Sequence, residues 1–426
     1  MLIFFRLASL IVDMTTGLFW RRSTLPNGLT TLLFPRETVN TTQLSVSVRF
    51  GSNQEPEEIA GVAHFIEHML AGGSTKRIHL SRGIEDSGGI IDFYTDHEHM
   101  MTTMDILPEK LIEASQVIVE LLFKEDFEEQ KFKKERKIIL NELSEALDDP
   151  SVRIEELLLS SLFKNHPLKR PVGGFPKTVE KLTLNQLGEA HKSSYVPQNM
   201  TLILTGNFSE KTAELVLKNF GIKTFRQPFL RKKIAFEIAK PESYVVEKKP
   251  GIAQTYLSIG ARTVCSTHQD SPKLDLMSAV LGGGTSSRLF VGLREKNTLT
   301  YDVSCDHNKG VDFGYFNINC AIEDKKLGKA KNLILKELSK VRTDKVSVEE
   351  LNRGKNLIYA EILRGMDNPH ECSEILAYME MQFHSERALV DYIDKIKAVS
   401  CRDIMEAANC YLQEDSLSTV ILEPTK

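Results

Sequence analysis

The sequence predicts an α+β fold of two homologous domains, each a mostly antiparallel β-sheet covered by α-helices. Alternating apolar and polar residues, typical of half-buried strands, occur at 44–51 and again at 254–261. Each stretch is followed by a polar segment, an apolar helical segment and a glycine cluster, at 71–74 and at 282–285. Strands alternating with clustered helices are typical of this fold class. The 426 residues also leave each half long enough for its own core.

The two halves end alike, which supports the internal repeat. Residues 181–208 and residues 398–423 each have the pattern of a helix, a break beside a tyrosine, and an apolar strand. The charged, proline-bearing stretch between the halves suits a linker. The predicted division is an N-terminal extension at 1–19, a first domain at 20–224, a linker at 225–249 and a second domain at 250–426.

The N-terminal extension makes a poor signal peptide. It is apolar up to Val12, but Arg6 is its only positive charge before Asp13, and it has no clear small-residue cleavage site. The apolar part is also shorter than the roughly 20 residues that cross a bilayer, so we expect no membrane association. Met14 is an alternative start, which leaves open whether residues 1–13 belong to the mature protein.

The most informative motif is His64-Phe-Ile-Glu67-His68. On a helix the two imidazoles, four residues apart, project from one face, and Glu67 leans over the same rim. Apolar neighbours favour a buried helix, and Gly72-Gly73 provides a stop. The pattern predicts a zinc hydrolase in which His64 and His68 bind the metal beside a carboxylate. A zinc site needs a further protein ligand from elsewhere in the chain.

A long helix over 123–149 supplies candidates for that ligand. Its apolar repeat buries one face, and Asp148-Asp149-Pro150 ends it. Glu135 and Glu142 lie almost in line within the apolar stripe. Burying carboxylates without a cation or a metal costs several kcal/mol. The stripe therefore favours a nearby metal, and the alternative is a partly exposed helix edge with surface ion pairs.

The second half lacks the equivalent metal site. Aligning the two glycine clusters places Asp275, Ser278 and Ala279 at the positions of the first half's motif residues. Neither serine nor alanine is a usual zinc ligand. We therefore expect the second domain not to bind the metal.

Composition excludes some function classes. The net charge is −4 with both signs well mixed, and no basic block suggests a nucleic-acid groove. All six cysteines lie in the second half without C-x-x-C spacing. This usage favours free thiols in a reducing compartment, and we expect a cytoplasmic protein.

The H-x-x-E-H motif, together with Glu142 and an acidic residue seven positions earlier, resembles the inverted zincins. Within that group the chain resembles the pitrilysin and insulin-degrading enzyme family, in its mitochondrial processing peptidase-like branch, over approximately residues 20–424. The resemblance implies one Zn²⁺ per chain, bound by His64, His68 and Glu142. It also implies that Glu67 is the general base acting on zinc-bound water, and that Glu135 orients the ligands from behind.

The resemblance extends to Arg294 and Tyr301. They match the arginine and tyrosine that reach from the metal-free domain to the substrate carbonyl in active family members. Both are hydrogen-bond donors that could stabilise a developing oxyanion. Without the family, a surface arginine and a packed tyrosine would explain them. Asp92 departs from the small polar residue expected in the strand beside the active site.

The predicted function is that of a zinc metalloendopeptidase that cleaves unfolded peptides or presequence-like segments. The substrate would bind as an extended strand near 90–95. The resemblance implies that each chain forms half of a clam-like chamber, closed by a second copy, with a heterodimer of related chains as the alternative. A non-catalytic structural or peptide-binding subunit of the same fold is the competing function, and a purely structural zinc site is a third.

Overall fold

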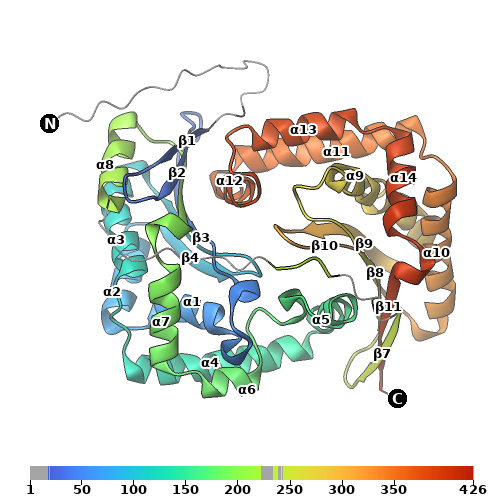
Figure 1. Cartoon of the computed structure of the whole chain (residues 1–426), viewed down its shortest axis with the longest axis horizontal. Helices are drawn as coiled ribbons and strands as arrows, with labels where there is room; N and C mark the ends of the chain where they lie inside the picture. Colours follow the sequence, from blue (N-terminus) through green and yellow to red (C-terminus); the bar gives the residue numbers. More distant parts are fainter. Residues whose placement is uncertain (1–17, 19, 222–233, 238–240, 242, 426) are drawn as a thin grey trace.

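The computed structural model describes residues 18, 20–221, 234–237, 241 and 243–425 and contains two β-sheets side by side (Figure 1). The first sheet has the strand order β1 (Arg21–Thr24), β2 (Thr30–Pro35), β6 (Met200–Gly206), β3 (Thr42–Val48), β5 (Met100–Ile106) and β4 (Ile90–Thr95). The second has the order β7 (Tyr244–Lys249), β11 (Leu417–Pro424), β8 (Thr255–Arg262), β10 (Gly314–Ile322) and β9 (Thr300–Lys309).

The two sheets share one topology. In each, the last strand in sequence pairs parallel with an early strand (β6 with β2, β11 with β7) and antiparallel with the next one (β3 or β8). The remaining pairs are antiparallel, and β4 and β9 occupy the matching edges. The predicted α+β class and the internal repeat are therefore confirmed. The first sheet carries β1 as an additional strand.

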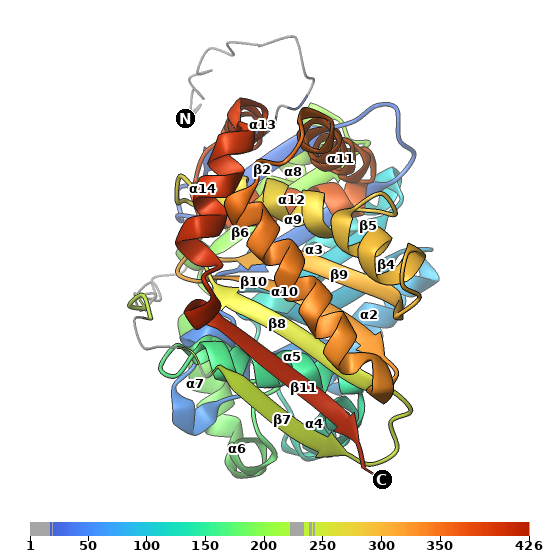
Figure 2. The same cartoon turned by 90° about the vertical axis from the view of Figure 1, so that its right-hand side faces the viewer.

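Helices cover both sheets. Those of the first half are α1 (Val62–Gly72), α2 (Thr75–Asp86), α3 (Leu111–Phe123), α4 (Glu129–Asp148), α5 (Pro150–Leu162), α6 (Pro176–Lys181), α7 (Leu184–Ser194) and α8 (Glu210–Phe220). Those of the second half are α9 (Ser271–Gly282), α10 (Leu327–Thr343), α11 (Val348–Asp367), α12 (Pro369–Phe383), α13 (Ala388–Ala398) and α14 (Cys401–Tyr411). Figure 2 shows α10 in front of the second sheet, with α14 beside α10. Within the described residues, no helix combines the length and apolar composition needed to cross a bilayer.

One helix of each half packs against the sheet of the other half. Helix α5, from the first half, packs on β8 and β11, whereas α12, from the second half, packs on β3 and β6. Both lie between the sheets in Figure 1. Each helix forms a separate apolar core with its host sheet. The two halves of the sequence are therefore not independent packing units, because one face of each sheet is buried by a helix from the other half.

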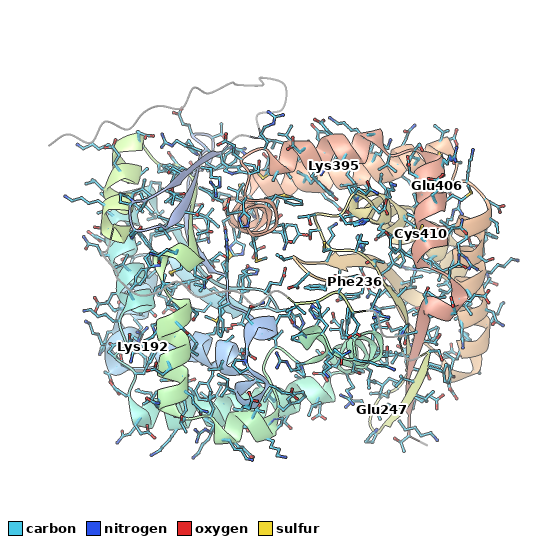
Figure 3. All side chains as sticks on the ribbon, viewed as in Figure 1. Lys192, Phe236, Glu247, Lys395, Glu406 and Cys410 are labelled. Atoms are coloured by element: carbon cyan, nitrogen blue, oxygen red, sulfur yellow. The ribbon has the colours of Figure 1, made fainter. Side chains whose placement is uncertain are left out.

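Polar contacts reinforce the exchange. Arg153 of α5 forms a bidentate ion pair with Glu247 of β7, at 2.6 and 2.8 Å; Glu247 is labelled in Figure 3. Ser161 of α5 lies 2.7 Å from Ser418 of β11, both buried. On the other sheet, Ser45 of β3 donates to Ser373 of α12 at 3.1 Å. The equivalent helices thus make similar hydroxyl contacts with their host sheets.

The structure corrects two boundaries of the sequence prediction. Tyr244–Lys249, expected as the end of the linker at 225–249, forms strand β7. Residues 222–233 of that region lie outside the described residues. Of the expected extension at 1–19, Leu18 is buried with Trp20 against α12. The rest of that segment is not described.

Replacing Leu158 of α5 by alanine tests whether the exchanged helix stabilises both halves. Leu158 is 1% exposed and lies so close to β8 that a Cβ on Gly260 would come within 2.9 Å of it. We expect Leu158→Ala to lower the free energy of unfolding by about 2–5 kcal/mol, in a denaturant titration followed by circular dichroism. Leu215→Ala, at a position 38% exposed on α8, is the control and should change stability by less than about 0.5 kcal/mol. Equal effects would show that α5 is not a stabilising element.

Candidate active site

The predicted motif helix is α1, which runs from Val62 to Gly72. Its apolar residues are fully buried, so the helix lies inside the first domain. His64, Glu67 and His68 project together from one partly buried face, and one ligand atom from each lies within 4.8 Å of the others. The two imidazole rings meet edge to face at 4.8 Å.

The start of α1 is fixed by a buried carboxylate. Glu55 accepts hydrogen bonds from the backbone N–H groups of Gly61, at 2.8 Å, and Ala63, at 2.7 Å. These groups belong to the first turn, where helical N–H donors otherwise have no partner. Burial raises the pKa of Glu55 to about 8 despite both hydrogen bonds. His64, the first motif residue, therefore directly follows the helix start that these hydrogen bonds hold in place.

Helix α4 crosses α1 and brings two carboxylates to the imidazoles (Figure 1). An oxygen of Glu142 lies 3.1 Å from Nε2 of His68 and 3.9 Å from Nε2 of His64. Glu135 is buried and lies seven residues before Glu142 on the same helix. Its carboxylate oxygen is 3.3 Å from Nδ1 of His68. Gly72 permits this crossing, since a Cβ there would meet the Glu135 carboxylate at 3.1 Å. The structure therefore brings together His64, His68, Glu67, Glu135 and Glu142.

The donor set fits a zinc ion. Two imidazole Nε2 atoms and a carboxylate oxygen converge, and such ligands leave a position open in catalytic zinc sites. The second ring nitrogen of His68 faces Glu135, an arrangement that fixes the tautomer of metal-binding histidines. Among the described residues, neither Glu135 nor Glu142 pairs with a lysine or an arginine. A cation at this point would neutralise them.

Burial shapes the protonation of the site in the metal-free protein. It lowers the pKa of His64 to about 4, with help from His68, so His64 is neutral and able to bind a metal near pH 7. Burial also favours neutral His68, but the hydrogen bond to Glu135 and the nearby carboxylates outweigh it and raise its pKa. For Glu67, burial raises the pKa to about 7, and the charges of Asp92 and Glu142 act in the same direction.

An unpaired sheet edge borders the site. Strand β4 packs beside α1 and pairs within the described structure only with β5. Its outer backbone groups are thus available to another strand. Asp92 is exposed on this strand, and Ile90 is 68% exposed.

A cavity of about 370 Å³ adjoins the His64 side of this cluster. Its walls come from the end of α4, from α5 and from the loop at 168–176. Gly173 in that loop lies close to His64, since a Cβ there would be 3.5 Å from Nδ1. The sequence does not indicate this cavity, because it forms only where the end of α4, α5 and the loop at 168–176 fold against one another.

Arg294 and Tyr301 form a pair in the second half, apart from the metal-binding residues. Arg294 lies on the helical turn Phe290–Glu295, with its guanidinium 4.3 Å from the ring centre of Tyr301. Tyr301 is 81% exposed at the start of β9. Within the described residues, no hydrogen bond or ion pair joins either side chain to His64, His68 or Glu142. Arg294 also has no carboxylate partner there.

The position equivalent to His64 in the second half holds a different cluster. Asp275 of α9 accepts from Nδ1 of His307, at 2.7 Å, and from Tyr392, at 2.8 Å, and it pairs with Lys309. These partners lower the pKa of Asp275 to about 2 although burial opposes this. In the described part of this half, no group of three candidate metal ligands is found.

Comparisons with known proteins agree with this organisation. A family model described as insulinase (peptidase family M16) matches residues 31–174, and one described as peptidase M16 inactive domain matches residues 181–358. An uncharacterized zinc protease of Bacillus subtilis is 26% identical, over 93% of this chain and 96% of its own. One from Rickettsia felis is also 26% identical, over 94% and 96% of the two chains.

Solved structures share the fold. A putative M16-like peptidase from Alicyclobacillus acidocaldarius has a TM-score of 0.86 at 21% identity, covering 95% of this chain and 98% of its own. A chain of complex III2 from Candida albicans has a TM-score of 0.77 at 18% identity, covering 95% of each chain. Together the two family models span most of the described sheets and helices, and the chain belongs to the insulinase or pitrilysin family of peptidases, peptidase family M16.

Proposed function

We propose that the protein is a zinc-dependent endopeptidase that hydrolyses peptide bonds in unfolded chains. The observation that carries the proposal is the convergence of His64, His68 and Glu142 beside Glu67. Three ligands and a neighbouring carboxylate of raised pKa are the parts that metal-assisted hydrolysis needs.

The proposed ligands of one Zn²⁺ are His64, His68 and Glu142, with Glu135 holding the ring of His68 from behind. When bound, the ion supplies Lewis acidity, which polarises a carbonyl and lowers the pKa of a water molecule toward about 7. The neutral state of His64 suits such binding, because this ring has no extra proton to lose.

Glu67 is the proposed general base. A carboxylate with a pKa near 7 in the metal-free site can take a proton from water and later give it to the leaving amine. An ordinary glutamate, with a pKa near 4.3, is a weaker base and takes the proton less readily. A positive ion nearby would lower this pKa, so that Glu67 is ionised and ready to accept a proton at neutral pH.

Arg294 and Tyr301 are the proposed stabilisers of the oxyanion. The guanidinium has no carboxylate partner among the described residues and lies on an exposed phenol ring. Both groups therefore keep hydrogen-bond donors for a substrate. Each well-placed donor typically contributes about 2–4 kcal/mol to transition-state stabilisation.

The substrate is proposed to be an extended peptide that adds a strand to the edge of β4. Backbone hydrogen bonds along that edge tolerate many sequences, which suits unfolded or presequence-like segments. We further propose that two copies close a clam-like chamber, or that a related chain replaces one of them. The free cysteines of the second half suit a reducing, cytoplasmic setting.

A non-catalytic role is the second candidate, since a chain of complex III2 shares the fold. That likeness concerns the fold alone. The complete set of ligand and base residues favours the enzyme, because a structural subunit has no need of Glu67 next to three metal-binding groups.

Glu67→Gln separates the two functions. We expect the variant to bind about one zinc per chain, measured by metal analysis, because the amide leaves His64, His68 and Glu142 in place. Cleavage of an unfolded peptide should fall by at least about 100-fold, since the amide cannot accept the proton. Glu145→Gln, on an exposed face of α4, is the matched control and should cleave normally. Retained cleavage by Glu67→Gln would reject the assigned base.

The pH dependence tests the neighbours of Glu67. Since the charge of Asp92 raises the pKa of Glu67, Asp92→Asn should move the acidic limb of the kcat/KM profile to lower pH. The shift should be a fraction of a pH unit, because Asp92 is exposed and solvent screens its charge. Asp86→Asn, an exposed change on α2, is the control. An unchanged limb would mean that Glu67 does not set it.

Arg294→Ala and Tyr301→Phe test the oxyanion contacts. Each should lower kcat by roughly 10² to 10³-fold, the loss typical of an oxyanion donor. Zinc content should stay unchanged, because neither side chain touches the metal-binding residues. Wild-type turnover in both variants would remove the pair from the site. Lys296→Ala, exposed beside the same turn, serves as the control.

A further inference from the structure

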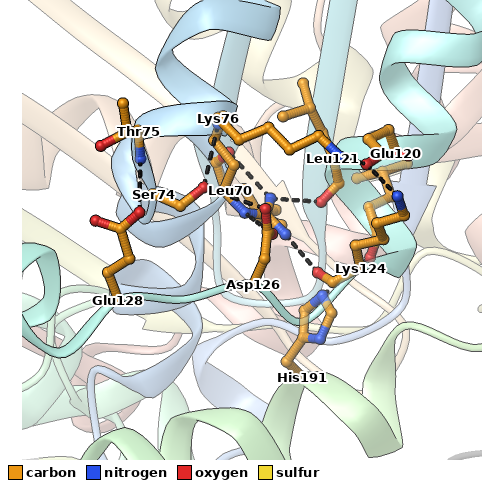
Figure 4. A network of polar contacts seen from close by, with 12 residues as sticks. Leu70, Ser74, Thr75, Lys76, Glu120, Leu121, Lys124, Asp126, Glu128 and His191 are labelled. Carbon is orange, nitrogen blue, oxygen red and sulfur yellow. Dashed lines mark hydrogen bonds and ion pairs between the residues drawn. The ribbon is translucent and has the colours of Figure 1, made fainter.

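The end of α1 meets a buried arginine that the proposed mechanism does not use. Arg77, on α2, is 1% exposed. Its guanidinium donates to the carbonyls of Leu70, at 3.2 Å, and Leu121, at 2.6 Å, and to that of Lys124. Figure 4 shows these acceptors around one point, together with Asp126. The Nε of Arg77 donates to Asp126 at 2.8 Å.

The residues around Arg77 also join the end of α1 to the start of α4, and we call this region the junction. The backbone N–H of Glu128, just before α4, donates to the carbonyl of Gly73 at 2.8 Å. The Glu128 carboxylate accepts from the N–H of Thr75 at 3.0 Å (Figure 4). Ser74 caps α2 and donates to Asp126 at 3.2 Å. One cluster therefore fixes the end of the histidine helix, the end of α3 and the start of the helix that carries Glu142.

The charge of Arg77 suits this position. It faces carbonyls in the last turns of α1 and α3, where helix dipoles favour a cation. The planar guanidinium carries five donors in a fixed fork, whereas a lysine ammonium offers a single centre that cannot reach three carbonyls and a carboxylate in the same geometry. Phe127, whose ring centre lies 4.6 Å away, covers one face of the guanidinium. A buried charge is an expensive way to gain stability alone, so the cluster is better explained by the geometry that it imposes.

That geometry matters at the metal-binding residues. His68 lies two residues before Leu70, close to the junction, but Glu142 lies 14 residues beyond Glu128. Since a helix rises 1.5 Å per residue, Glu142 lies about 21 Å along α4 from the junction. A tilt of about 3° at the junction would displace the Glu142 backbone by about 1 Å. Metal–ligand distances tolerate only about 0.2 Å.

We propose that Arg77 is a positioning residue, which sets the angle between α1 and α4 and thereby places Glu142 against His64 and His68. The inference rests on the proposed metal site but not on peptidase activity. Arg77 touches neither substrate nor metal and acts through the backbone of the two helices.

The test measures metal binding directly. Co²⁺ serves as the probe, because its visible absorption reports ligand geometry and its affinity can be measured by competition with a chelator. We expect Arg77→Lys in the full chain to weaken Co²⁺ binding by about 10-fold or more, the effect typical of residues that orient ligands. Its absorption spectrum should also change. Arg288→Lys is the matched control, since Arg288 makes a bidentate pair with Glu350 in the half without a metal site.

Each outcome decides the proposal. Weaker binding and an altered spectrum in folded Arg77→Lys, with Arg288→Lys unchanged, would support it; wild-type affinity and spectrum in both would overturn it. If Arg77→Lys does not fold, Asp126→Ala decides, because Asp126 is partly exposed and orients Nε of Arg77. That variant should weaken Co²⁺ binding several-fold, and an unchanged affinity would overturn the proposal. A wild type that binds Co²⁺ but cleaves no peptide would reject the proposed function alone.

Discussion

The crossing of α1 and α4 is the contact on which the rest of the site depends. It brings carboxylates from a charged helix against imidazoles on an apolar one, and Gly72 allows the close approach. Neither helix alone has a complete ligand set. Placing Glu135 there buries negative charge, a cost that a bound cation would offset, whereas the Glu142 side chain is 43% exposed. The surrounding structure therefore has to hold two helix axes in a fixed relation, with buried polar contacts at both ends of α1.

The exchange of α5 and α12 gives this arrangement a rigid frame. Because each sheet is covered on one face by a helix from the other half, the two halves cannot rotate freely about a linker. Helix α5 directly follows α4, with Asp149 ending one helix and capping the next. Helix α4, which carries Glu142, thus leads directly into α5, which packs on the second sheet. The second half contributes to the site by restraining the far end of α4 through α5.

Local patterns predict much of this structure. The apolar run around the motif and its glycine stop locate α1, and the seven-residue spacing of Glu135 and Glu142 places both on one face of α4. The repeat predicts the second sheet. The helix exchange was not predicted, because an amphipathic helix does not encode which sheet it covers. Strand β7 lies within the segment predicted as linker, because its glutamate and lysines continue the charged, proline-bearing stretch of sequence. Glu55 and Arg77 look like surface charges in the sequence, and only the packing shows them buried.

The second half provides a comparison for the metal site within the same chain. At the position of His64 it holds a buried carboxylate, Asp275, and this anion is neutralised by Lys309 and hydrogen-bonded by His307. In that copy the buried charge is therefore balanced by an internal ion pair. In the first half, the corresponding region holds Glu135 and Glu142 without a lysine or arginine partner among the described residues. The two halves thus differ in how they treat buried carboxylates: the second half supplies Lys309 as an internal cation, whereas the first half places two imidazoles beside its carboxylates.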